Sequence, residues 1–115
     1  MIPAPTRILL STSPADFRKS IDGLAALVEL HLRESPLSGT MFVFRNQRGN
    51  ALKLLVWSSG GFILVYKKLE RGRFRVPAST SDRLSLTPAE TAAILEGIDL
   101  RLATRLPRWE PNLNI

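Results

Sequence analysis

The residues best suited to bind a partner are basic ones gathered in the middle of the chain. Between positions 45 and 75, one acidic residue, Glu70, stands among eight basic residues, which leaves a local charge of +7. The other residues carry a net charge of −1, so this segment accounts for the whole positive excess of the chain, whose net charge is +6. Cationic side chains concentrated in this way favour an anionic partner, most often nucleic acid. We therefore predict nucleic-acid contacts at Arg45, Arg48, Lys53, Lys67, Lys68, Arg71, Arg73 and Arg75.

A structural explanation of the same charges stays open. Long Lys and Arg side chains also run along the edges of small sheets, where they prevent pairing with another chain. Within the basic segment, Arg71 and Arg73 flank Gly72 in a predicted turn. A glycine there permits close approach of the backbone to a phosphate, which favours the binding interpretation at this turn.

Catalytic chemistry has little support in the sequence. The chain has no Cys, which excludes disulfides, thiolate metal sites and Cys nucleophiles, and its single His is His31. The acidic residues are scattered, and capping or ion pairing accounts for most of them, whereas a two-metal nuclease needs converging carboxylates. We predict no enzyme activity, no catalytic residue, no metal site and no cofactor. The acids considered are Asp16, Asp22, Glu70, Asp82 and Asp99.

Two helices and a short first strand are predicted around the basic segment. Residues 7–10 form the first strand, and Ser13-Pro14-Ala15-Asp16 has the residue types that begin a helix. One apolar stripe then follows at helical spacing and should end before Pro36. Its members are Phe17, Ile21, Leu24, Val28 and Leu32. A second helix begins at Thr87, with a capping box to Glu90, and ends near Gly97.

The segment between the helices predicts an antiparallel meander. β-rich runs at 41–45, 52–57, 62–68 and 73–76 are separated by turns too short for parallel crossovers, and a polar loop follows over 77–86. Alternation places Leu52, Leu54 and Val56 on one face, with Lys53, Leu55 and Trp57 on the other. Much of both faces is therefore apolar. One helix can cover one face, so a second helix, a partner subunit or a ligand must cover the other.

These elements predict one α+β domain over residues 1–100, followed by a C-terminal tail over 101–115. The fold is an antiparallel meander of about four strands, with a short N-terminal strand and two flanking α-helices. Phe62, Phe74 and Trp57 are expected in its core, and stacking of these side chains and of Tyr66 on unpaired bases is the alternative. The N-terminus lacks the features of a signal peptide, and the longest apolar stretch is too short to span a bilayer. We expect a cytoplasmic protein without a membrane partner.

The chain also resembles a known family along residues 2–100. The resemblance lies in blocks at 16–28 (DFRKSIDGLAALV), 36–46 (PLSGTMFVFRN), 53–57, 61–62, 66–74 (YKKLERGRF), 84–87 and 95–99. In these blocks the chain looks like the small TnpB-type accessory protein of bacterial insertion-sequence family sixty-six. That protein is unrelated to the RNA-guided nuclease with which it shares a name. The resemblance implies a role in transposition, beside a separate transposase that carries the strand-cleaving chemistry.

Two functions follow as hypotheses. In the first, the protein is an accessory protein of transposition that binds DNA, at the element ends, through basic antiparallel strands. It does so within a complex with the transposase and other element-encoded proteins. In the second, it is a protein–protein adaptor that binds the transposase, or associates with itself as a homo-oligomer, without contacting DNA. The +7 segment and the family resemblance motivate the first hypothesis. The apolar content of both sheet faces and the tail that bears Trp109 motivate the second.

Overall fold

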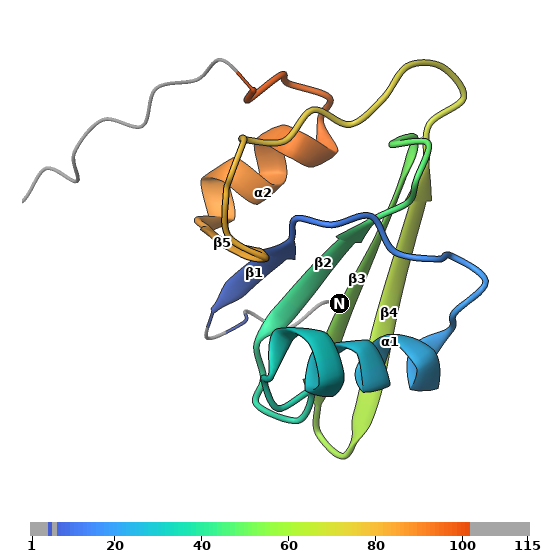
Figure 1. The fold of residues 1–115 in the computed structure, drawn as a ribbon, viewed down its shortest axis with the longest axis vertical. Helices are drawn as coiled ribbons and strands as arrows, with labels where there is room; N and C mark the ends of the chain where they lie inside the picture. Colours follow the sequence, from blue (N-terminus) through green and yellow to red (C-terminus); the bar gives the residue numbers. More distant parts are fainter. Residues whose placement is uncertain (1–4, 6, 102–115) are drawn as a thin grey trace, which may run out of the picture.

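Five strands form one mixed sheet in the computed structural model, which describes residues 5 and 7–101 (Figure 1). The order across the sheet is β4-β3-β2-β1-β5. The strands are β1 (Ile8–Ser11), β2 (Met41–Arg45), β3 (Ala51–Ser58), β4 (Gly61–Lys68) and β5 (Arg83–Leu86). With two helices packed on this sheet, the predicted α+β class is confirmed. The predicted tail lies outside the described residues except for Arg101.

The meander is confirmed for three of its four predicted strands. β2, β3 and β4 pair antiparallel, with Leu54 opposite both Val43 and Val65. β1 runs parallel to β2, with Leu9 opposite Phe42, because the first helix provides the long crossover that a parallel pair needs. β1 is an interior strand of the sheet, between β2 and β5.

The predicted strand at 73–76 is wrong, and the strand at the far edge comes from the predicted loop instead. Phe74 is fully buried and Val76 nearly so, whereas Arg73 is exposed, so the alternation of this segment is real. The segment nevertheless belongs to no strand, because it crosses a face of the sheet to bury those two side chains. β5 takes the edge position and pairs antiparallel with β1, with Leu84 opposite Leu10.

The first helix begins later than predicted. α1 spans Ile21–Leu27 and continues as a π-helical turn, η1, over Val28–Leu32. The residues predicted to start it dock on the sheet instead, since the Ala15 N–H donates to the Arg45 carbonyl at 2.9 Å. Asp16 caps a local turn, where its carboxylate accepts the Arg18 N–H at 2.9 Å. The apolar stripe itself is confirmed, because Leu24, Val28 and Leu32 are buried.

The second helix, α2 (Pro88–Leu95), has the predicted capping box. The Glu90 N–H donates to Thr87 Oγ1 at 3.0 Å, and the Thr87 N–H donates to Glu90 Oε1 at 2.9 Å. Beyond the helix, Gly97 has a φ of +86°, as expected of a C-terminal cap glycine. Within the described residues, neither helix has the length and apolar character to cross a membrane.

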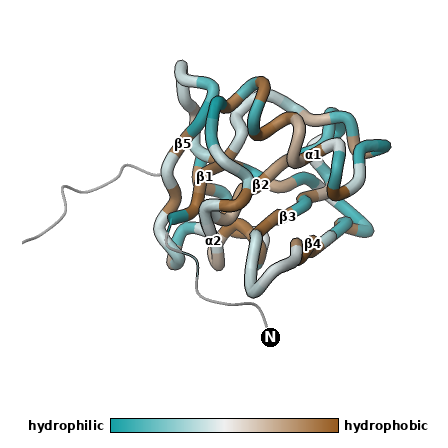
Figure 2. Tube along the Cα trace, turned by 90° about the horizontal axis from the view of Figure 1, so that it is seen from below, coloured by the Kyte–Doolittle hydropathy of each residue, from teal (hydrophilic) through white to brown (hydrophobic). Residues whose placement is uncertain are grey.

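The two helices cover opposite faces of the sheet. Figure 2 shows α1 and α2 on either side of strands that are largely hydrophobic. On one face, α1 and η1 pack over a core that includes Leu9, Phe42, Phe44 and Leu55. On the other, α2 and the 73–76 segment cover a core that includes Leu10, Val43, Leu54 and Val56. The second apolar face is therefore covered from within the chain, by a second helix.

Candidate nucleic-acid interface

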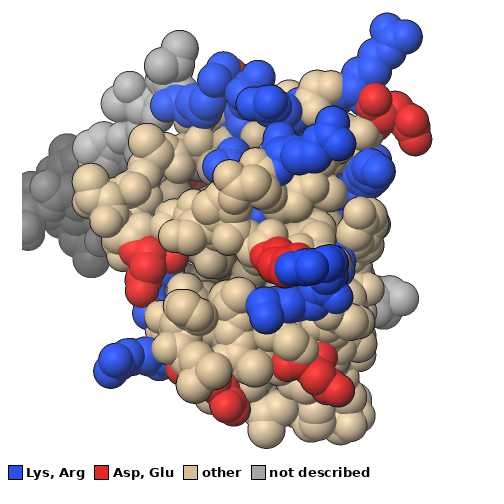
Figure 3. All heavy atoms as spheres, turned by 45° about the vertical axis from the view of Figure 1, so that its right-hand side comes forward, with Lys and Arg blue, Asp and Glu red and all other residues tan. Residues whose placement is uncertain are grey.

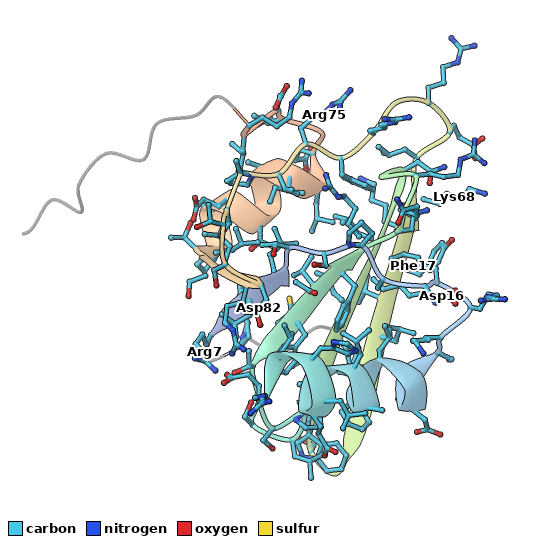
Figure 4. The ribbon with its side chains drawn as sticks, viewed as in Figure 1. Arg7, Asp16, Phe17, Lys68, Arg75 and Asp82 are labelled. Atoms are coloured by element: carbon cyan, nitrogen blue, oxygen red, sulfur yellow. The ribbon has the colours of Figure 1, made fainter. Side chains whose placement is uncertain are left out.

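Most of the predicted basic residues meet at one end of the sheet. Two backbone hydrogen bonds hold the β2–β3 turn (residues 46–50) beside the loop that follows β4 (residues 69–73). The Leu69 N–H donates to the Asn50 carbonyl, and the Phe74 N–H donates to the Gly49 carbonyl, both at 2.8 Å. We call this region the basic end; it consists of Arg45, Arg48, Lys67, Lys68, Arg71, Arg73 and Arg75. Figure 3 shows Lys and Arg atoms gathered at the upper end of the molecule, and Figure 4 labels Lys68 and Arg75 there.

A hollow of about 180 Å³ lies between the turn and the loop. Arg48, Arg71 and Arg73 line it together with Asn50, and Glu70 is the acidic residue of its wall. Gly72, with a φ of +81°, turns the loop and leaves open space where a Cβ would stand. Three arginines from two chain segments thus surround a space suited to an anionic group such as a phosphate.

Exposure divides the basic end into contact residues and supporting ones. Arg48, Lys67, Lys68, Arg71 and Arg73 are exposed, whereas Arg45 and Arg75 are partly buried. Lys67 is also tethered, since its Nζ donates to the Leu95 carbonyl at 2.6 Å. The five exposed side chains can contact a partner without rearrangement of the fold.

Arg45 supports the loop from beneath. Its guanidinium donates to the Phe74 carbonyl at 3.2 Å and so ties β2 to the residue between Arg73 and Arg75. Burial, and then the nearby charge of Arg75, lower the pKa of Arg45 below its ordinary value. Phe74 is fully buried in the core, so its burial fixes the backbone position of Arg73 and Arg75 on either side of it.

Lys53 is the predicted site residue that the structure does not bring to the basic end. It is 7% exposed, and its Nζ donates to the carbonyls of Phe17 at 3.0 Å and Lys19 at 2.8 Å. The ammonium also lies 5.0 Å from the centre of the Phe17 ring and 5.4 Å from that of Tyr66. The alternation of β3, which sets Lys53 beside Leu55 and Trp57, is the sequence signal that indicated an inward position.

The aromatic residues lie mainly in the protein interior. Phe74 is fully buried as predicted, and Phe62 is half-buried with its ring 5.0 Å from Trp57 in an edge-on arrangement. Tyr66 is 53% exposed and stands 6.1 Å from the Phe17 ring. Phe17 is labelled in Figure 4 over the strands. Stacking on a base would therefore involve Tyr66 before the other aromatic side chains of the sheet.

A second hollow, of about 210 Å³, has the residue types of a hydrolase triad in its wall. His31, Asp82, Ser11 and Ser13 line it. In the part of the chain that the structure describes, no hydrogen bond joins His31 to Asp82 or to either serine, and Asp82 instead accepts Arg83 Nε at 3.1 Å. A triad needs those hydrogen bonds for proton transfer. The same described residues contain no group of His and acidic side chains placed to hold a metal ion.

Comparison with known proteins gives consistent matches along the chain. The family model described as IS66 Orf2 like protein matches residues 6–105. Uncharacterized protein y4jC of Sinorhizobium fredii is 37% identical over 105 residues, which cover 91% of this chain and 90% of that protein. Uncharacterized protein y4hO of the same organism is 38% identical over 96 residues, which cover 83% of each chain. No solved structure matches this chain.

Proposed function

The chain belongs to the family of IS66 Orf2-like proteins, which supports an accessory role in transposition, and on that premise we propose that it binds DNA through the basic end. The observation that carries the proposal is the hollow in which Arg48, Arg71 and Arg73 meet. Arginines arranged around one space bind phosphate oxygens with two N–H groups each, and such contacts position a protein on the DNA backbone.

The proposed division of labour assigns no catalytic step to this protein. The basic end contacts phosphates of the element DNA in the bacterial cytoplasm, and the transposase recognises this complex and cleaves the strands. Contacts to phosphates supply affinity that depends steeply on salt. Sequence preference for the element ends would require additional contacts to base edges, for which the exposed arginines have the right chemistry.

The adaptor hypothesis loses one of the two observations that motivated it, and the other, the tail that bears Trp109, lies outside the described residues. An apolar sheet face left bare would need a partner protein, but α2 and the 73–76 segment cover that face. The basic end then remains the most distinctive surface of the described part of the chain. DNA binding is therefore the function we favour, with the transposase as a second partner in the same complex.

The proposal is tested with two double variants of equal charge change. Arg71→Glu with Arg73→Glu reverses the hollow, whereas Lys19→Glu with Arg33→Glu reverses two exposed residues outside the basic end. Binding to labelled duplexes of the element's terminal repeat and of a scrambled sequence is then measured. We expect the first variant to lose binding to both duplexes and the control to keep most of it. Equal loss in the two variants would contradict a localised site.

A further inference from the structure

One edge of the sheet is long, apolar and open. β4 is the last strand of the sheet and pairs on one side only, along all eight residues Gly61–Lys68 (Figure 1). Its other side faces no strand among the described residues. β5, at the opposite edge, has only four residues. An open edge presents unpaired N–H and C=O groups, and natural proteins usually interrupt such an edge with charge, proline or a bulge.

The middle of β4 carries none of these interruptions. Residues 62–66 are all apolar or aromatic, and the charges appear only at the end of the strand, at Lys67 and Lys68. Phe62, Ile63, Leu64 and Val65 are each only half-buried, although the same alternating rows are buried on β3. The edge therefore has apolar side chains on both faces that further pairing would cover.

The sequence of β4 is complementary to itself in one antiparallel register. When Leu64 lies opposite Leu64 of a second copy, a two-fold axis normal to the sheet keeps the α1 side of both copies on the same face. Phe62 then lies opposite Tyr66, and Ile63 opposite Val65. Aromatic pairs and pairs of β-branched residues are those that stabilise neighbouring antiparallel strands.

The same register also separates the charges. Lys67 lies opposite Gly61, and no lysine of β4 faces a lysine of the second copy. A shift by two residues would instead set Lys67 against Ile63 and Lys68 against Phe62. In the register centred on Leu64, the half-exposed Tyr66, which contacts Phe17 within its own chain, gains Phe62 of the second copy as an aromatic neighbour, whereas the shift by two residues would set it against Leu64.

We infer that β4 is a homodimer interface, at which two copies pair antiparallel about Leu64 to form one continuous ten-stranded sheet. The two basic ends would then lie at opposite ends of the paired strands, about 27 Å apart at Lys68, since eight residues each advance roughly 3.4 Å. The inference does not depend on the proposed function, because β4 pairing involves backbone groups and apolar side chains. A dimer would present two copies of the basic end to one DNA molecule.

The absence of cysteine from the chain allows a direct test by disulfide trapping. Leu64→Cys places two thiols directly opposite each other, at a Cα separation of about 4.5–5.5 Å that suits a disulfide. Tyr66→Cys is the matched control on the same face of the strand, where the two thiols would be about 14 Å apart. We expect rapid oxidation of the Leu64→Cys variant to a covalent dimer and slow oxidation of the control. Position 66 is the more exposed of the two, so random collision would give the opposite order.

Sedimentation equilibrium of the unmodified protein provides the second measurement. We expect a dimer, and we expect Leu64→Lys to be monomeric because it sets two ammonium groups at the two-fold axis. Circular dichroism tests whether that variant is folded; if it is not, the mass of the unmodified protein and the order of thiol oxidation decide. A monomeric unmodified protein, or oxidation at position 66 as fast as at 64, would overturn the inference. A dimer that fails to bind duplex would contradict the proposed function and leave the interface standing.

Discussion

Lys53 and the basic end come from the same positively charged stretch of sequence but use their charge in different ways. The Lys53 ammonium is bound by two carbonyls of residues 17 and 19 and lies against two aromatic rings. The exposed arginines at 71 and 73 line an open hollow. The first charge attaches a loop to the sheet, whereas the second is available to a partner.

The neighbouring charged residues of the two regions also differ in whether they form ion pairs within the fold. Beside Lys53, the exposed Arg18 is already paired with Asp16, at 2.7 Å between Nη2 and Oδ2. At the basic end, the described residues give Arg48, Arg71 and Arg73 no ion pair. Net charge along a sequence therefore overstates the charge that a partner can contact, because some charged groups are already paired within the fold.

The strongest test of the comparison removes the support of the basic end. Phe74→Ala leaves a cavity beneath the loop, and we expect a loss of about 3–5 kcal/mol in the free energy of unfolding, as for buried Phe residues in general. Urea denaturation measures it. The exposed neighbour Arg73→Ala is the control and should stay within about 0.5 kcal/mol of the unmodified protein. A similar small change for both would mean that burial of Phe74 does not hold the loop.

The second test concerns the internal role of Lys53. Lys53→Met keeps an unbranched side chain, one heavy atom shorter, but leaves the carbonyls of residues 17 and 19 without their donor. We expect a loss of about 1–3 kcal/mol in the free energy of unfolding, the usual cost of an unsatisfied buried group. Lys68→Met, at an exposed position, should change it by less than about 0.5 kcal/mol. Equal effects at the two lysines would remove the distinction between the regions.

The smallest effect is expected at the ion pair beside Lys53. Hydrogen bonds from the Arg18 side chain and backbone lower the pKa of Asp16 from 3.8 to about 2. Because the folded-state pKa is the lower one, this pair contributes stability above pH 3.8 that is lost as the pH falls toward 2. Arg18→Ala should return the Asp16 pKa toward 3.8 in an NMR titration. Asp99, whose pKa Arg101 lowers to about 2 in the same way, should not change. An unchanged Asp16 pKa would contradict the pairing.

Sequence reasoning predicted the elements whose signals are local. The capping box at Thr87, the apolar stripe of Leu24, Val28 and Leu32, and the antiparallel order of β2, β3 and β4 are all present. It failed where tertiary contacts decide. Pro14 to Asp16 resemble a helix start, but a hydrogen bond to the end of β2 holds them in a loop. The alternation at 73–76 resembles a strand, but no strand lies beside it to pair.

The candidate site shows the same division between local and tertiary signals. The density of basic residues indicated where charge would gather, and the structure brings seven of the eight to one end. Only the fold reveals that Lys53 lies beneath the 17–19 loop, although its position in an alternating strand hinted at an inward side chain. The turn at Arg71, Gly72 and Arg73 had a sequence signal, but the approach of Arg48 to it depends on long-range backbone contacts and had none.

The most direct test of the central claim is the salt dependence of duplex binding in three proteins. The logarithm of the binding constant is measured against the logarithm of salt concentration for the unmodified protein, for Arg71→Ala with Arg73→Ala, and for folded Lys53→Met. Each lost phosphate contact lowers the slope by about 0.9, so the double variant should lose about 1.8. Lys53→Met should keep the full slope, because its charge is satisfied internally. A reduced slope for Lys53→Met together with an unchanged slope for the double variant would contradict the account.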